Sequence, residues 1–115
     1  MQSVQGILSA LEGTEHLLYS DPNNPYESIT IRARISGGLL TLADDECDYG
    51  PDGGWSHRTL SFDRENTEKA LLLLLERNPD PIEALRGMTG YSDRTKRFQS
   101  ACQARGIDYK TALSF

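Results

Sequence analysis

The sequence predicts an α+β fold. A small antiparallel sheet, made of a hairpin and a third strand, packs against a buried leucine-rich helix, and a helical C-terminal subdomain follows. Two observations lead to this prediction. Residues 28–35 alternate apolar and polar side chains, with the period of a half-buried strand. Residues 70–75 are apolar on nearly every side, which is typical of a helix surrounded by a core. At 115 residues there is room for one core, so we expect a single domain over residues 1–115.

The first element is predicted to be a helix. Ser3 can cap it, apolar residues follow at helical spacing over residues 4–11, and Gly13 can end it. Residues 16–19 are short and apolar, and they either extend this helix or begin a strand. Two prolines and several Asx residues predict a turn or loop at 21–25.

The clearest element is a hairpin about Gly37-Gly38. Two consecutive glycines suit a two-residue turn, which needs positive φ at both positions. On one face of the preceding strand lie Ile29, Ile31, Ala33 and Ile35. Folding the chain about the glycines makes three compatible cross-strand pairs: Ile35 with Leu40, Ala33 with Leu42, and outward-facing Arg34 with Thr41.

Residues 44–54 are predicted to form a loop, because they contain five acids, three glycines and one proline. Residues 55–62 offer the third strand, in which Leu60 and Phe62 share one face. The β-rich half of the domain is therefore expected to span residues 1–62, and the helical half residues 63–115.

Three helices are predicted in the second half. The first begins at Asp63, contains the run at 70–75 and ends at Asn78-Pro79. Leu72 to Leu75 surround more than half of the helix circumference, so we expect most of them to be shielded. The second begins at Asp80-Pro81, a capping carboxylate followed by a first-turn proline, and reaches about Met88.

The last predicted helix is capped by Ser92. Phe98, Ala101 and Cys102 line its apolar face. Gly106 can take the left-handed position at its end, so that Ile107 folds back on Cys102.

Charge divides the chain into two unlike parts. Residues 1–57 hold nine acids and two bases, a net charge of −7, whereas residues 58–115 hold eight acids and ten bases, a net charge of +2. The total of −5 argues against binding of nucleic acids or anionic membranes by the whole surface. A polarised small protein of this kind is expected to work through contact surfaces.

No motif predicts catalysis, a cofactor or a metal. A calcium loop starting at Asp44 would place Tyr49 where glycine is needed and Trp55 where glutamate is needed; one starting at Asp48 ends on Thr59. Cys47 and His57 could be imagined as nucleophile and base, but the acids around Cys47 in the sequence disfavour a thiolate.

The apolar runs are too short to cross a bilayer. The two cysteines suggest free thiols in a reducing cytosol, so a cytoplasmic location is expected.

We therefore expect a non-enzymatic protein-binding module whose partner is a protein with a basic surface. Small acidic domains without catalytic motifs are frequent among immunity proteins and phage anti-defence inhibitors of the anti-CRISPR-like type, which occupy nucleic-acid-binding surfaces. Carboxylates would steer the encounter and two aromatic rings would supply the desolvated contact. The expected contact residues are Asp44, Asp45, Glu46, Asp48, Tyr49, Asp52 and Trp55.

The alternative is a DNA-binding regulator of the helix-turn-helix type. Residues 82–105 have the outline of that motif, and Arg94, Lys96 and Arg97 would lie near the start of its second helix. Against it, Lys96 occupies a position at which the motif usually has an apolar residue.

Overall fold

The computed structural model describes residues 3–21, 27–48 and 53–115 of the chain. In these ranges the order of elements is α1 (Val4–Leu11), β1 (Glu15–Ser20), β2 (Glu27–Ser36), β3 (Leu39–Asp48), β4 (Trp55–Ser61), α2 (Arg64–Arg77), α3 (Pro81–Arg86), α4 (Lys96–Ala104) and β5 (Lys110–Ser114). The predicted α+β fold is confirmed.

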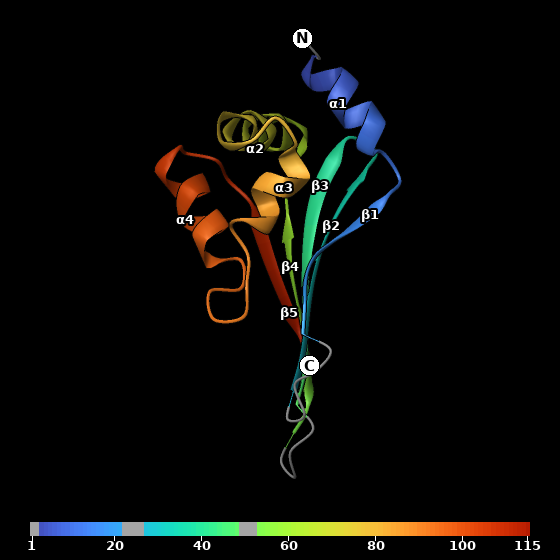
Figure 1. Ribbon diagram of the computed structural model, residues 1–115, viewed down its shortest axis with the longest axis vertical. Coiled ribbons are helices and arrows are strands. Elements are labelled where there is room, and N and C mark those ends of the chain that lie inside the picture. Colours follow the sequence, from blue (N-terminus) through green and yellow to red (C-terminus); the bar gives the residue numbers. More distant parts are fainter. Residues whose placement is uncertain (1–2, 22–26, 49–52) are drawn as a thin grey trace.

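The strands form one antiparallel sheet in the order β1-β2-β3-β4-β5. The first four strands follow one another along the chain, whereas three helices intervene before β5 adds to the edge of β4. In Figure 1, α2, α3 and α4 lie together on one side of the sheet, and α1 lies at one end of it. The other ends of β2, β3 and β4 extend past the helices (Figure 1).

The core lies between the sheet and the helices. On the helix-covered face, Ile31 and Leu42 are almost wholly buried, and they face the buried side of α2 and Phe98 of α4. The opposite face of the central strands carries Thr30, Arg32 and other side chains, none of which is buried. We call this second surface the open face; its members on β2, β3 and β4 are Ser28, Thr30, Arg32, Arg34, Ser36, Leu39, Thr41, Ala43, Asp45, Cys47, Trp55, His57, Thr59 and Ser61.

The predicted hairpin is confirmed in its turn and in its register. Gly37 and Gly38 have φ of 63° and 76°, a combination that a side chain would strain. The three cross-strand pairs form as expected: Ile35 with Leu40, Ala33 with Leu42, and Arg34 with Thr41.

The predicted helix ends are confirmed at several places. Ser3, Asp63 and Asp80 each accept a backbone N–H at a helix start. After α4, Gly106 has φ of 67°, and Ile107 donates its N–H to the carbonyl of Cys102 at 2.9 Å. The starts of α1, α2 and α3 and the end of α4 are thus set by local sequence.

Two of the expected boundaries are wrong. Residues 44–48 belong to β3 and not to a loop, because they pair with β2 on one side and β4 on the other. The last helix begins at Lys96 and not after Ser92. The chain first turns between Gly90 and Arg94, which exchange two backbone hydrogen bonds, and Arg94 takes a positive φ of 55°.

Most of the four leucines of α2 are shielded, as expected. Leu73 and Leu74 are buried and Leu75 is partly so, whereas Leu72 is 53 % exposed. Residues 16–19, left open between helix and strand, lie in β1. Strand β5 was not predicted at all. Among the described residues, no helix is both long and apolar enough to cross a membrane.

Candidate functional site: an open sheet face

The strand geometry divides the acidic residues of β3 between the two faces of the sheet. Successive side chains of a strand point in opposite directions. Asp44 and Glu46 therefore lie on the helix-covered face, and Asp45 lies on the open face. The end residue Asp48 is exposed, and the expected contact residues Tyr49 and Asp52 lie outside the described residues.

Asp44 and Glu46 are engaged with the C-terminal part of the chain. Arg94 places one nitrogen 2.8 Å from a carboxylate oxygen of Asp44 and another 3.1 Å from one of Glu46. The Asp44 side chain is only 7 % exposed and that of Arg94 only 20 %. One guanidinium thus engages two of the carboxylates that the sequence had suggested for a partner.

The open face carries a connected group of polar side chains around an exposed aromatic ring. His57 Nδ1 is hydrogen-bonded to the carboxylate of Asp45, its direct neighbour across β3 and β4. Arg32 lies 3.7 Å from the same carboxylate. The ring of Trp55 stacks on that of His57, with centroids 5.8 Å apart and planes at 9°. Trp55 remains 49 % exposed, so one of its surfaces is open to solvent.

Of these residues, the sequence identified Asp45 and Trp55 and missed Arg32 and His57 as their partners. Period-two alternation was the available signal, because it places Arg32 of β2 on the outward face. The alternation could not be applied to β3, because residues 44–48 are predicted from sequence to be a loop. A loop prediction does not say on which side of the sheet Asp45 lies.

The residues of the DNA-binding alternative are mostly occupied within the protein. Arg94 is paired with acids as described above. Arg97 donates to the carbonyls of Gly87 and Thr89 at 3.0 and 3.3 Å and lies 3.1 Å from the carboxylate of Asp93. Lys96 is exposed at the start of α4. Two of the three cations therefore hold the segment between α3 and α4 in place.

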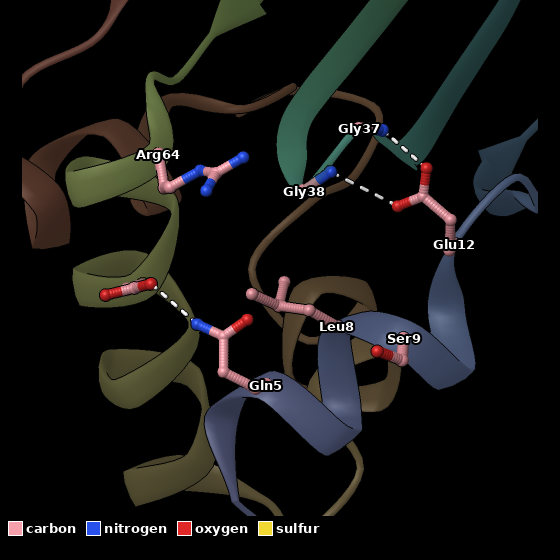
Figure 2. Close-up of a pocket in the computed structure, with 8 residues that line it drawn as sticks. Gln5, Leu8, Ser9, Glu12, Gly37, Gly38 and Arg64 are labelled. Atoms are coloured by element: carbon pink, nitrogen blue, oxygen red, sulfur yellow. Dashed lines mark hydrogen bonds between the residues drawn. The ribbon is translucent and has the colours of Figure 1, made fainter.

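A shallow hollow of about 450 Å³ lies where α1, α2 and the hairpin turn meet. Figure 2 shows Glu12 reaching the N–H groups of Gly37 and Gly38. Gln5 donates to Glu68 at 2.8 Å across the same hollow. The Arg64 side chain points toward it (Figure 2). Because most of its polar groups bond to one another, the hollow is best described as a junction that fixes α1 against the hairpin.

The described residues offer no other constellation with evident chemistry. Within ranges 3–21, 27–48 and 53–115, no three His, Cys, Asp or Glu side chains gather as a metal site would require. Cys47 lies on the open face opposite Trp55, and Cys102 is buried in the core. Burial raises the pKa of the Cys102 thiol to about 12, which keeps this thiol protonated at neutral pH.

Comparisons with known proteins found no matching family model, no matching curated protein and no matching solved structure.

Proposed function

We propose that this chain is a non-enzymatic protein-binding module whose contact surface is the open face, centred on Trp55, His57 and Asp45. The observation that supports it best is the half-exposed Trp55 ring held parallel to His57, which is itself bonded to Asp45. A ring already fixed in position loses little conformational entropy when a partner covers it. Tryptophan is also among the residues that contribute most binding energy at interfaces.

The partner we propose is a protein with a basic surface. The exposed side of an indole attracts a guanidinium or ammonium group, and a nearby carboxylate strengthens that attraction. Asp45 lies on the same face, two residues along β3 from Cys47, which is the register partner of Trp55. Its carboxylate already pairs with Arg32 and His57 but stays 25 % exposed, so a lysine or arginine above Trp55 would contact the indole first and this carboxylate second. This agrees with an inhibitor of the immunity-protein or anti-CRISPR-like type, acting in the cytoplasm on a nucleic-acid-binding surface.

The proposed surface is narrower than the sequence suggested. Asp44 and Glu46 face the helices and are paired with Arg94, so they contribute to the fold. Asp45 and Trp55 remain as the described contact residues on the open face.

Capture of a partner from host lysate tests the proposal, with W55A and L72A as matched variants. Each removes an exposed apolar side chain, of 49 % and 53 % exposure, from opposite layers of the molecule. We expect the wild type and L72A to retain the same partner and W55A to lose it. With the purified partner, W55A should raise the dissociation rate, and D45N should lower the association rate and its salt dependence. Equal retention by W55A and L72A would show that the open face is not the contact surface.

Duplex DNA provides the second arm of the test. The proposal expects no retardation of DNA in a gel at physiological salt. Retardation by the wild type that weakens as salt rises, and that K96E abolishes, would favour the helix-turn-helix alternative instead.

A further inference from the structure

The two edges of the sheet differ in how they are protected against pairing with another chain. At the β1 edge, the register with β2 is interrupted between Leu17 and Tyr19, and Arg86 of α3 donates to the Leu17 carbonyl at 3.1 Å. A bulge and a covering side chain are devices that prevent edge-to-edge association.

In the part of the chain that the structure describes, the β5 edge has neither device. Its register with β4 is regular over five residues, all five are exposed, and Lys110 carries their one charge. Two exposed apolar side chains lie at this edge: Leu113, at 49 %, and Phe115 just beyond the strand, at 88 %. Regular, exposed and weakly charged edges are those that accept a further strand.

We propose that β5 pairs with β5 of a second copy of this chain, antiparallel, about a twofold axis at Ala112. The two five-stranded sheets would join into one. This proposal goes beyond the proposed function and does not depend on it. If both hold, the assembly presents two open faces side by side and binds a partner with two sites more tightly through multivalency.

A second copy suits this edge because the strand is complementary to itself. With the axis at Ala112, the whole of Lys110–Ser114 is paired, and Lys110 lies opposite Ser114 of the second copy, so no like charges face each other. Leu113 lies opposite Thr111, and Phe115 lies opposite Tyr109 of the second copy. Tyr109 is half-buried against Phe62, with ring centroids 5.5 Å apart, so the exposed ring of Phe115 gains an aromatic neighbour that is already held in place.

Charge also favours this edge over the rest of the surface. Two copies of a chain with a net charge of −5 repel each other, and residues 111–115 contain no ionisable side chain. Two short strands bury less than the roughly 1,200–2,000 Å² of a stable specific interface. We therefore expect a reversible dimer that forms as concentration rises.

Analytical ultracentrifugation across micromolar to millimolar concentrations tests the dimer. We expect the wild type to shift from monomer to dimer, and F115A to raise the dissociation constant about tenfold, because each of two aromatic pairs is lost. L72A is the control and should behave as the wild type. A112K, which places two lysines at the axis, should remain monomeric. A wild type that stays monomeric at millimolar concentration overturns the proposal, as does equal dimerisation of F115A and L72A.

Disulfide trapping tests the register. In a C47S background, A112C places two thiols at the proposed axis, where opposed Cα atoms of paired strands lie at about 4.5–5.5 Å and allow a disulfide. The matched control is L17C, at the exposed but protected β1 edge. Under mild oxidation, A112C should form covalent dimers much faster than L17C. Equal rates, with circular dichroism confirming that both variants are folded, would refute pairing through β5.

Discussion

Arg94 explains why two acidic residues of β3 contribute to the fold and not to the proposed contact surface. Its guanidinium bridges Glu46 and Asp44, which lies 50 residues earlier in the chain, and its backbone has a positive φ of 55°. A carboxylate as buried as that of Asp44 would be very unfavourable without a partner. Arg94 therefore offsets the cost of placing Asp44 on the buried face of β3.

Replacement of Arg94 tests that dependence. Arg94→Met should lower the free energy of unfolding by about 3 kcal/mol, since it leaves a buried carboxylate without its partner. The double variant Asp44→Leu with Arg94→Met should recover most of the loss, because it removes the two most buried charges together and leaves only Glu46, whose side chain is 35 % exposed. Urea denaturation, monitored by circular dichroism, measures the free energy of unfolding of the single and the double variant. A double variant no more stable than the single one would show that the pair does not act as a unit.

The two thiols should differ in reactivity. Cys102 is fully buried and burial raises its pKa to about 12, whereas Cys47 is partly exposed on the open face. Since the thiolate is the reacting species, a disulfide reagent at neutral pH should label Cys47 in the native protein and Cys102 only after denaturation. The C47S variant is the control and should show no rapid labelling. Rapid labelling of that variant would mean that the core opens readily.

At the scale of elements, success of the sequence-based prediction depended on how local the determining signal was. The hairpin was predictable because alternation and the Gly37-Gly38 turn lie within about a dozen residues. Strand β5 was not predictable, because all its residues are exposed and its sequence therefore has no buried face to reveal it. Its partner β4 also lies some 50 residues earlier in the chain. The buried side of α2 was obscured by Leu72, an exposed leucine inside an apolar run.

Alanine substitutions in α2 should destabilise the protein when they are made on the buried side of the helix and have little effect on the exposed side. Leu73→Ala and Leu74→Ala remove side chains that are 4 % and 2 % exposed, and each should lower the free energy of unfolding by about 2–5 kcal/mol. Leu72→Ala should change it by less than about 0.5 kcal/mol, because Leu72 is mostly in solvent. Thermal and urea denaturation of the three variants provide the comparison. Similar losses at 72 and 73 would mean that the helix is rotated from its position here.

The start of α2 should make stability depend on pH. Hydrogen bonds from the backbone and side chain of Asn66 hold the pKa of Asp63 below its ordinary value of 3.8. A group whose pKa is lowered by folding stabilises the protein fully above its ordinary pKa, and this stabilisation fades as pH falls through the lowered value. The wild type should therefore be more stable than D63A at neutral pH, with a difference that shrinks in acid.

D63N is the control for that pH dependence. Asparagine caps a helix without titrating, so its advantage over D63A should persist in acid. Denaturation series at several pH values measure both differences. A wild-type advantage that stays constant down to strongly acidic pH would contradict the assigned role of Asp63.

For the whole molecule, the fold class and core were predictable and the candidate site was only partly so. The core follows from apolar periodicity, which each segment carries in itself. The open face forms only when β2, β3 and β4 are aligned, since Arg32, Asp45 and His57 come from three different strands. Asp44, Glu46 and Arg94 were assigned to rival sites from sequence, and the structure places them in one internal cluster.

The rate of amide hydrogen exchange should increase from the centre of the sheet to its edges. Strands β2 and β3 each have a neighbour on both sides and carry most of the buried apolar residues, whereas β5 is exposed and paired on one side. Amides of the central strands should exchange at rates close to those of global unfolding, and β5 amides fastest among the strands of a dilute sample. Mass spectrometry of peptic fragments can follow this. If the amides of β5 and β3 were equally protected from exchange in the monomer, the predicted ranking of the strands would be wrong.

The late position of β5 along the chain has a consequence during synthesis on the ribosome. Ser61 of β4 and Lys110 of β5 are register partners, yet 49 residues separate them. At about 5–20 residues per second, β4 emerges roughly 2–10 s before the strand that covers its edge. During that interval the nascent chain presents an unpaired edge, and neighbouring chains on the same messenger could add a strand to it. Slow translation of the segment encoding α3 and α4 would lengthen the exposure, so codon usage there becomes a determinant of yield.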